Sequence, residues 1–80
     1  MKIPAIKKLV ESFDIHSLVA AEEAILEEQQ SAIEIEGEDE GEQLTHVMAA
    51  IWIKNEMEKT GDAFPQALRA YTSRVRTSIS

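Results

Sequence analysis

The sequence contains no cysteine among its 80 residues. This absence excludes disulfide bonds, thiolate metal sites and cysteine nucleophiles. Only three glycines are present, and none stands in a phosphate-binding loop pattern, so nucleotide binding has no support. The hydroxyl residues lack the context of a nucleophile elbow or a catalytic triad. We therefore predict a protein that is not an enzyme, with no catalytic residue and no cofactor.

Long apolar runs are also missing. The longest run, residues 47–53, is far shorter than the ~20 residues that a membrane-spanning helix needs. Residues 1–8 have neither the apolar core nor the cleavage signal of a secretory peptide. These absences predict a cytoplasmic protein that does not bind membranes.

Basic residues are absent from the middle of the chain. Residues 11–42 hold twelve acids and no base, whereas residues 1–10 and 63–80 each hold three bases and no acid, and the net charge is −7. The acidic middle would repel a phosphate backbone, which argues against nucleic-acid binding. Basic ends and an acidic middle suit helices that pack side by side, or copies that associate head to tail.

The length allows one domain, residues 1–80. A chain this short buries only about 60% of the surface that its unfolded form exposes, so its stability is small. Disulfides, a metal or association with another chain usually supplement such a core. Disulfides are excluded without cysteine, and the third helix described below, with apolar residues on two faces, favours association.

The apolar spacing predicts an all-α fold of four helices. The first covers residues 3–12, and the second, capped by Asp14, covers about 15–29; one bent helix over 4–28 is the alternative. The third and longest lies within residues 39–60, with a capping box from Asp39 to Glu42, and ends at Gly61. Asp62 is expected to cap the fourth, which carries an apolar stripe: Phe64, Leu68, Tyr71, Val75 and Ile79.

The long central third helix carries apolar residues on two faces. One stripe consists of Leu44, Val47, Met48 and Ile51 at helical spacing. A helix on a small core needs one stripe, so this helix needs neighbours on both sides, from its own chain or from a second copy. The interaction candidates are the residues of the second face, together with Trp52 in the arc between the faces: His46, Ala50, Trp52, Ile53 and Met57.

A short segment at about residues 32–36 changes the period from 3.6 to 2, with Ile33 and Ile35 alternating with glutamates. A single strand cannot satisfy its own backbone. The segment is therefore expected either to lie as an extended loop over the helices or to pair with the same segment of another copy.

Several stretches resemble a family of short bacterial proteins classed as a domain of unknown function. They are residues 9–11 through 21–25, residues 35–47, and residues 67–71 through 74–76. The block Gly37-Glu38-Asp39-Glu40-Gly41-Glu42-Gln43-Leu44-Thr45-His46 is the most specific part. The resemblance covers nearly the whole chain and implies a helical fold, but no functional residues.

Three sites with acidic or histidine side chains are candidates for chemistry. The turn from Glu36 fails as a calcium loop, because its twelfth position is Val47 rather than glutamate. Glu42 and His46 stand i, i+4 apart, but the paired helices of a carboxylate-bridged metal site are lacking. Glu22 lies on the apolar side of its helix, either at the edge of the core or as a perturbed acid in a pocket.

The sequence therefore predicts a small acidic interaction module that associates with itself, as a homodimer, or with another protein. The alternative is a small domain that binds a ligand or a divalent metal through the acidic turn and His46. The biological role, the identity of any partner and the oligomeric state do not follow from the residues.

Overall fold

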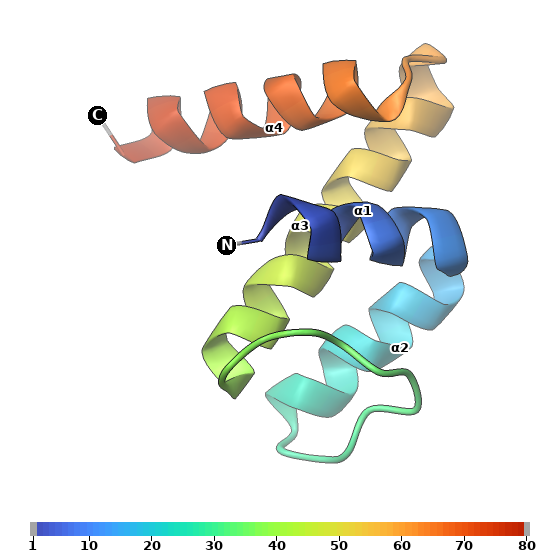
Figure 1. The fold of residues 1–80 in the computed structure, drawn as a ribbon, viewed down its shortest axis with the longest axis vertical. Helices are drawn as coiled ribbons and strands as arrows, with labels where there is room; N and C mark the ends of the chain where they lie inside the picture. The colour runs from blue at the N-terminus through green and yellow to red at the C-terminus, as the bar shows by residue number, and fades with distance from the viewer. Residues whose placement is uncertain (1, 80) are drawn as a thin grey trace.

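Helix α3 (Glu40–Thr60) runs through the middle of the computed structural model and contacts the three other helices, α1 (Ile3–Ser12), α2 (Ile15–Leu26) and α4 (Phe64–Ile79) (Figure 1). The structure describes residues 2–79, and the side chains of residues 2–75. Within that part the fold is all-α with four helices, as predicted. Figure 1 shows α2 running antiparallel to α3, while α4 crosses the far end of α3.

The chain breaks between α1 and α2, so the alternative of one bent helix is wrong. Phe13 is extended (φ −133°, ψ 150°), and the Asp14 carboxylate accepts a 2.8 Å hydrogen bond from the backbone N–H of Ser17. Lys54 of α3 reaches the end of α1, where its Nζ donates to the Val10 carbonyl oxygen at 3.0 Å. A cation at a helix C-terminus satisfies an orphan carbonyl and complements the helix dipole.

Helix α2 ends at Leu26, three residues earlier than the predicted residue 29. Glu28 adopts the left-handed conformation, with φ 59°. The N–H of Glu28 donates to the Ile25 oxygen and the N–H of Gln29 donates to the Ala24 oxygen. These two bonds form a Schellman motif, in which glycine is the usual residue at the position of Glu28. Because glycine is absent from this position, the sequence does not indicate that the helix ends here.

Both predicted ends of α3 are confirmed. The Asp39 carboxylate accepts from the Glu42 N–H at 2.8 Å, and the Glu42 carboxylate reaches back to the Glu38 N–H at 2.8 Å. The carboxylates also suit the positive end of the helix dipole. Gly61 ends the helix with a left-handed φ of 78°, and its N–H donates to the Met57 oxygen.

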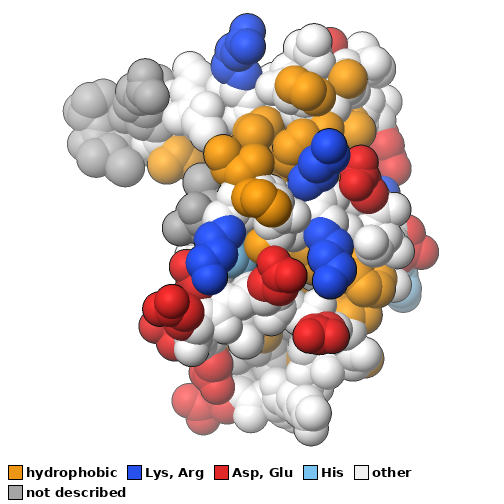
Figure 2. Space-filling model, viewed as in Figure 1, with side chains coloured by type: hydrophobic (Ala, Val, Ile, Leu, Met, Phe, Trp, Pro, Cys, Tyr) orange, Lys and Arg blue, Asp and Glu red, His pale blue; other side chains and the backbone are white. Residues whose placement is uncertain are grey.

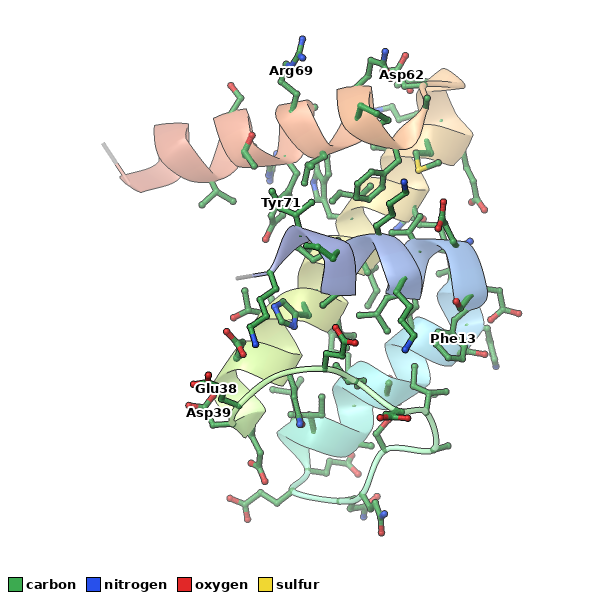
Figure 3. All side chains as sticks on the ribbon, in the orientation of Figure 1. Phe13, Glu38, Asp39, Asp62, Arg69 and Tyr71 are labelled. Carbon is green, nitrogen blue, oxygen red and sulfur yellow. The ribbon has the colours of Figure 1, made fainter. Side chains whose placement is uncertain are left out.

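Asp62 does not cap α4, so that prediction is wrong. The helix begins at Phe64, and its first i to i−4 bond runs from the Ala67 N–H to the Ala63 oxygen, which leaves Asp62 one residue too early. A cap serves the N–H groups two or three residues on, and Pro65, the third residue after Asp62, has no N–H. Figure 3 shows Asp62 and Arg69 directed away from the body and Tyr71 directed toward it.

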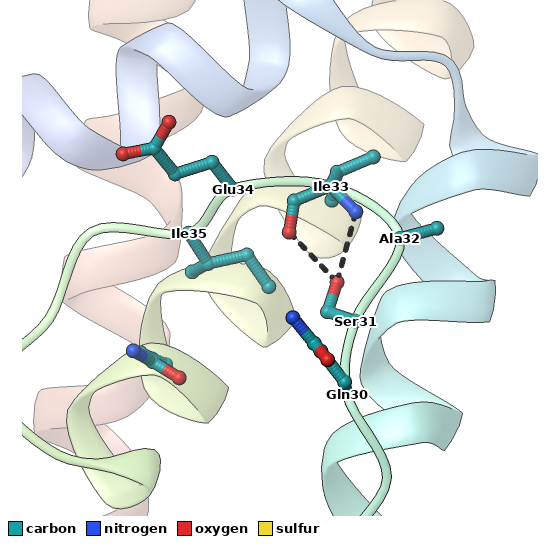
Figure 4. A pocket seen from close by; sticks show the side chains of 7 residues that line it. Gln30, Ser31, Ala32, Ile33, Glu34 and Ile35 are labelled. Atoms are coloured by element: carbon teal, nitrogen blue, oxygen red, sulfur yellow. Dashed lines mark hydrogen bonds between the residues drawn. The ribbon is translucent and has the colours of Figure 1, made fainter.

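The segment at residues 32–36 is an extended loop laid over the helices, one of the two predicted alternatives. Ile35 is buried and Ile33 half-buried, whereas Ala32, Glu34 and Glu36 are exposed, so the period of two is confirmed. No strand occurs in residues 2–79. The loop borders an open hollow of about 400 Å³, beside which the Ser31 hydroxyl bonds both the N–H and the oxygen of Ile33 (Figure 4).

Candidate interaction surface

His46 lies in the interior, where it joins three parts of the chain. Its side chain is fully buried on α3. Nε2 accepts a 2.9 Å hydrogen bond from the backbone N–H of Lys2, and Nδ1 lies 2.7 Å from the Glu36 carbonyl oxygen. Because a carbonyl only accepts and an amide N–H only donates, the hydrogen must sit on Nδ1. The imidazole therefore holds the start of α1 and the end of the loop against α3.

The second face of α3 packs mainly against the chain itself. Ala50 and Ile53 are fully buried, like His46, and belong to the core. Trp52 and Met57 are half-buried and pack against that core. The second face therefore needs no second copy, because α1, α2 and α4 all contact α3. Three of the five interaction candidates are accordingly not on the surface of the single chain.

Trp52 contacts α4 through two kinds of ring interaction. Its ring centroid lies 5.6 Å from that of Tyr71, with the planes tilted by 52°. The Arg74 guanidinium carbon stands 6.0 Å from the Trp52 centroid. Tilted aromatic pairs and cation–π contacts each contribute about 0.5–1.5 kcal/mol. These contacts fix α4 on α3.

The arrangement around His46 leaves no metal centre. Both ring nitrogens are taken up by backbone groups, and the Glu42 carboxylate accepts from the Glu38 N–H. Across residues 2–79, no group of three histidine or acidic side chains is placed to hold a metal ion. Glu42 therefore accepts a hydrogen bond at the start of α3. The His46 ring connects α3 to the backbone of Lys2 and Glu36.

Helix α2 carries a straight row of side chains that the chain does not cover fully. The row has the spacing i, i+4, i+7 and i+11, which keeps its members along one line of a helix. Leu26 is 62% exposed, and the other members are half-buried. The members are Ile15, Val19, Glu22 and Leu26. Glu22 is thus at the edge of the core and faces the surface.

Helix α3 carries a second row with the same spacing. Met48 is 50% exposed and Asn55 is exposed, while Leu44 and Ile51 are half-buried against the core. Of the first stripe predicted for this helix, Val47 is therefore the fully buried member. The row consists of Leu44, Met48, Ile51 and Asn55.

The two rows lie on the same side of the α2–α3 pair. The opposite side of α2, with Ser17, Ala20 and Ala24, borders the loop across a hollow of about 290 Å³. On α3, the side that carries His46 meets α1 and the loop. Because each row avoids those sides of two packed antiparallel helices, the rows flank one another on the outside. We call these eight residues the α2–α3 face.

Sequence reasoning placed three α3 members of this face, Leu44, Met48 and Ile51, in one apolar stripe together with Val47, and did not include Asn55. The signal that could have found the face is the repeated spacing of 4, 3 and 4 residues on neighbouring helices. Such a repeat is typical of helices that pack lengthwise against other helices. Its polar members, Glu22 and Asn55, also mark positions near solvent.

The fold and this surface define a small all-α domain with a partly exposed apolar face on two of its helices. None of the helices in the described residues combines the length and apolar character needed to cross a membrane. The chain belongs to a family of unknown function, DUF6952, which it matches over residues 1–80. The resemblance predicted from the sequence is thereby confirmed. No match was found among curated proteins or among solved structures.

Proposed function

We propose that this protein is a non-enzymatic protein–protein interaction module that associates with itself through the α2–α3 face, as a homodimer in the cytoplasm. The observation that carries the proposal is the pair of equally spaced, mainly apolar rows that one chain covers only in part. A row repeating at intervals of three and four residues is the pattern by which helices recognise other helices.

The energetics support association. Burying a large aliphatic side chain stabilises by about 1.5–3 kcal/mol relative to leaving it exposed. Leu26 and Met48 are at least half exposed, and four further aliphatic side chains on the face are partly exposed. Covering them would supplement the small core of an 80-residue chain.

Sedimentation velocity over a range of protein concentrations tests the proposal. The wild-type protein should shift from the mass of one chain to that of two as the concentration rises. Met48→Glu places a charge in the middle of the α2–α3 face and should weaken association at least tenfold. Ala20→Glu adds the same charge at an exposed position on the loop side of α2 and should leave association unchanged. A wild-type protein that stays monomeric would contradict the proposal.

A further inference from the structure

Helix α2 and the loop border a hollow on the side of α2 that faces away from the α2–α3 face. Its volume is about 290 Å³, and three polar residues, His16, Ser17 and Gln30, contribute to its lining. The other lining residues are aliphatic: Ala20, Ala21, Ala24, Ala32 and Ile33. We call this space the α2–loop hollow. Its aliphatic lining lies outside the core of the chain and outside the proposed interface.

The hollow exists because short side chains on α2 face a loop that is held in place. Ile35 is buried in the core and anchors the loop. The Ser31 hydroxyl bonds both the N–H and the oxygen of Ile33, which fixes the wall of the hollow. Figure 4 shows Ala32 directed from the loop toward α2. Alanine side chains on both walls are too short to close the gap, and a concave apolar surface in contact with water favours an apolar guest.

The surroundings of the hollow are acidic. Glu23 and Glu27 stand three and seven residues after Ala20, so the three lie along one edge of the hollow. Both glutamates are exposed, as is Glu34 of the loop, and none of these three acids forms an ion pair within the described residues. Residues 11–42, which supply both walls, contain no lysine or arginine.

Figure 2 shows how the charges are separated on one side of the molecule. Lysine and arginine side chains lie over α1 and α4. Toward the bottom of the view, where the loop and the start of α3 lie, the charged side chains are acidic. A charged ligand that reaches the hollow therefore meets a negative surface, which attracts cations and repels anions.

We propose that the α2–loop hollow binds a small primary amine with an aliphatic chain. The chain lies along α2 between the alanines and Ile33, and the ammonium group meets the glutamates at the edge. Residues 17–24 of α2 span about 10 Å at 1.5 Å per residue, which suits a short linear chain. Because the hollow and the α2–α3 face are on opposite sides of α2, this inference does not rest on self-association.

NMR titration of the backbone amides at neutral pH, with three ligands of equal chain length, tests the inference. Hexylamine carries a positive charge, hexanol carries none and hexanoate carries a negative charge. Hexylamine should shift the amide resonances of Ala20, Ala24 and Ile33 in a saturable manner. Its Kd should be at least threefold lower than that of hexanol and at least tenfold lower than that of hexanoate.

Two variants separate the contribution of the chain from that of the charge. Ala24→Leu fills the hollow and should raise the Kd of hexylamine and of hexanol at least tenfold, whereas Ala63→Leu, at an exposed position outside the hollow, should leave both values unchanged. The double variant Glu23→Gln, Glu27→Gln should raise the Kd of hexylamine to that of hexanol without affecting hexanol. Glu58→Gln, at an exposed position on α3, is the control for charge and should change neither value.

Three outcomes would overturn the inference. They are the absence of saturable shifts with hexylamine, shifts centred on Leu26 and Met48 of the α2–α3 face instead of the hollow, and equal Kd values for hexylamine and hexanol in the wild-type protein. The comparison of ligands in the wild-type protein decides the matter even if Ala24→Leu does not fold. Sedimentation measures association separately, so failure of this inference and failure of the proposed function are distinguishable.

Discussion

The ammonium group of Lys54 donates a 3.0 Å hydrogen bond to the backbone oxygen of Val10, and so ties the middle of α3 to the last turn of α1. The two residues are 44 positions apart in the chain. Lys54 is half-buried, so its aliphatic stem lies along the protein while its charged end satisfies a helix terminus.

Replacing Lys54 by methionine should destabilise the fold by about 1.5–3 kcal/mol, the usual contribution of a hydrogen bond to a charged group. Methionine keeps most of the apolar stem, so the loss reports the ammonium group rather than packing. Urea unfolding followed by circular dichroism measures the change. Lys59→Met, at an exposed position in the last turn of α3, serves as the control and should cost clearly less.

His46→Phe should destabilise the protein by about 2–4 kcal/mol. Phenylalanine roughly keeps the volume but leaves the Lys2 N–H and the Glu36 oxygen without their partner, and an unsatisfied buried group costs about 1–3 kcal/mol. Thr45→Ala, the exposed neighbour, should cost far less. Equal losses for the two variants in chemical denaturation would refute the connecting role of the imidazole.

Glu28→Gly should stabilise the protein by about 0.5–1 kcal/mol. A side chain in the left-handed region costs about 1–2 kcal/mol, and the greater freedom of glycine in the unfolded chain offsets part of the gain. Glu27→Gly is a matched control, because Glu27 has a negative φ of −91° and gains nothing from glycine. The two melting temperatures should therefore move in opposite directions.

Asp14 gives the fold a dependence on acid. The backbone hydrogen bond from Ser17, supported by a side-chain hydrogen bond from the same residue, lowers the pKa of Asp14 below its ordinary 3.8. The carboxylate therefore stabilises the folded state above pH 3.8, and this contribution is lost as the pH falls through the lowered pKa. The melting temperatures of wild type and Asp14→Asn should differ near neutral pH. They should converge once the pH lies below the lowered pKa of Asp14. A gap that persists in strong acid would contradict this account.

Much of the fold follows from local signals. Asp14, Asp39 and Gly61 each mark a helix end through chemistry that involves neighbouring residues, so the sequence alone locates them. Glu28 carries no such signal, because it takes the left-handed position where a glycine would normally mark the end of a helix. The early end of α2 was therefore missed.

The surface was harder to predict than the helices. Periodicity shows that α3 has two apolar sides, but it does not show which neighbours cover them. The structure assigns His46, Ala50 and Ile53 to contacts within the chain, through residues as distant in sequence as Lys2. The exposure of Met48 and Leu26 depends on where the other helices lie, which only the tertiary packing decides.

The central claim is that the α2–α3 face is covered by a second copy, and methyl NMR of Met48 tests it most directly. Met57 is half-buried and packs against the core away from that face, so its methyl resonance is an internal reference. We expect the Met48 methyl resonance to shift progressively as protein concentration rises, while the Met57 resonance stays in place. Two resonances that remain fixed at all concentrations would contradict the account.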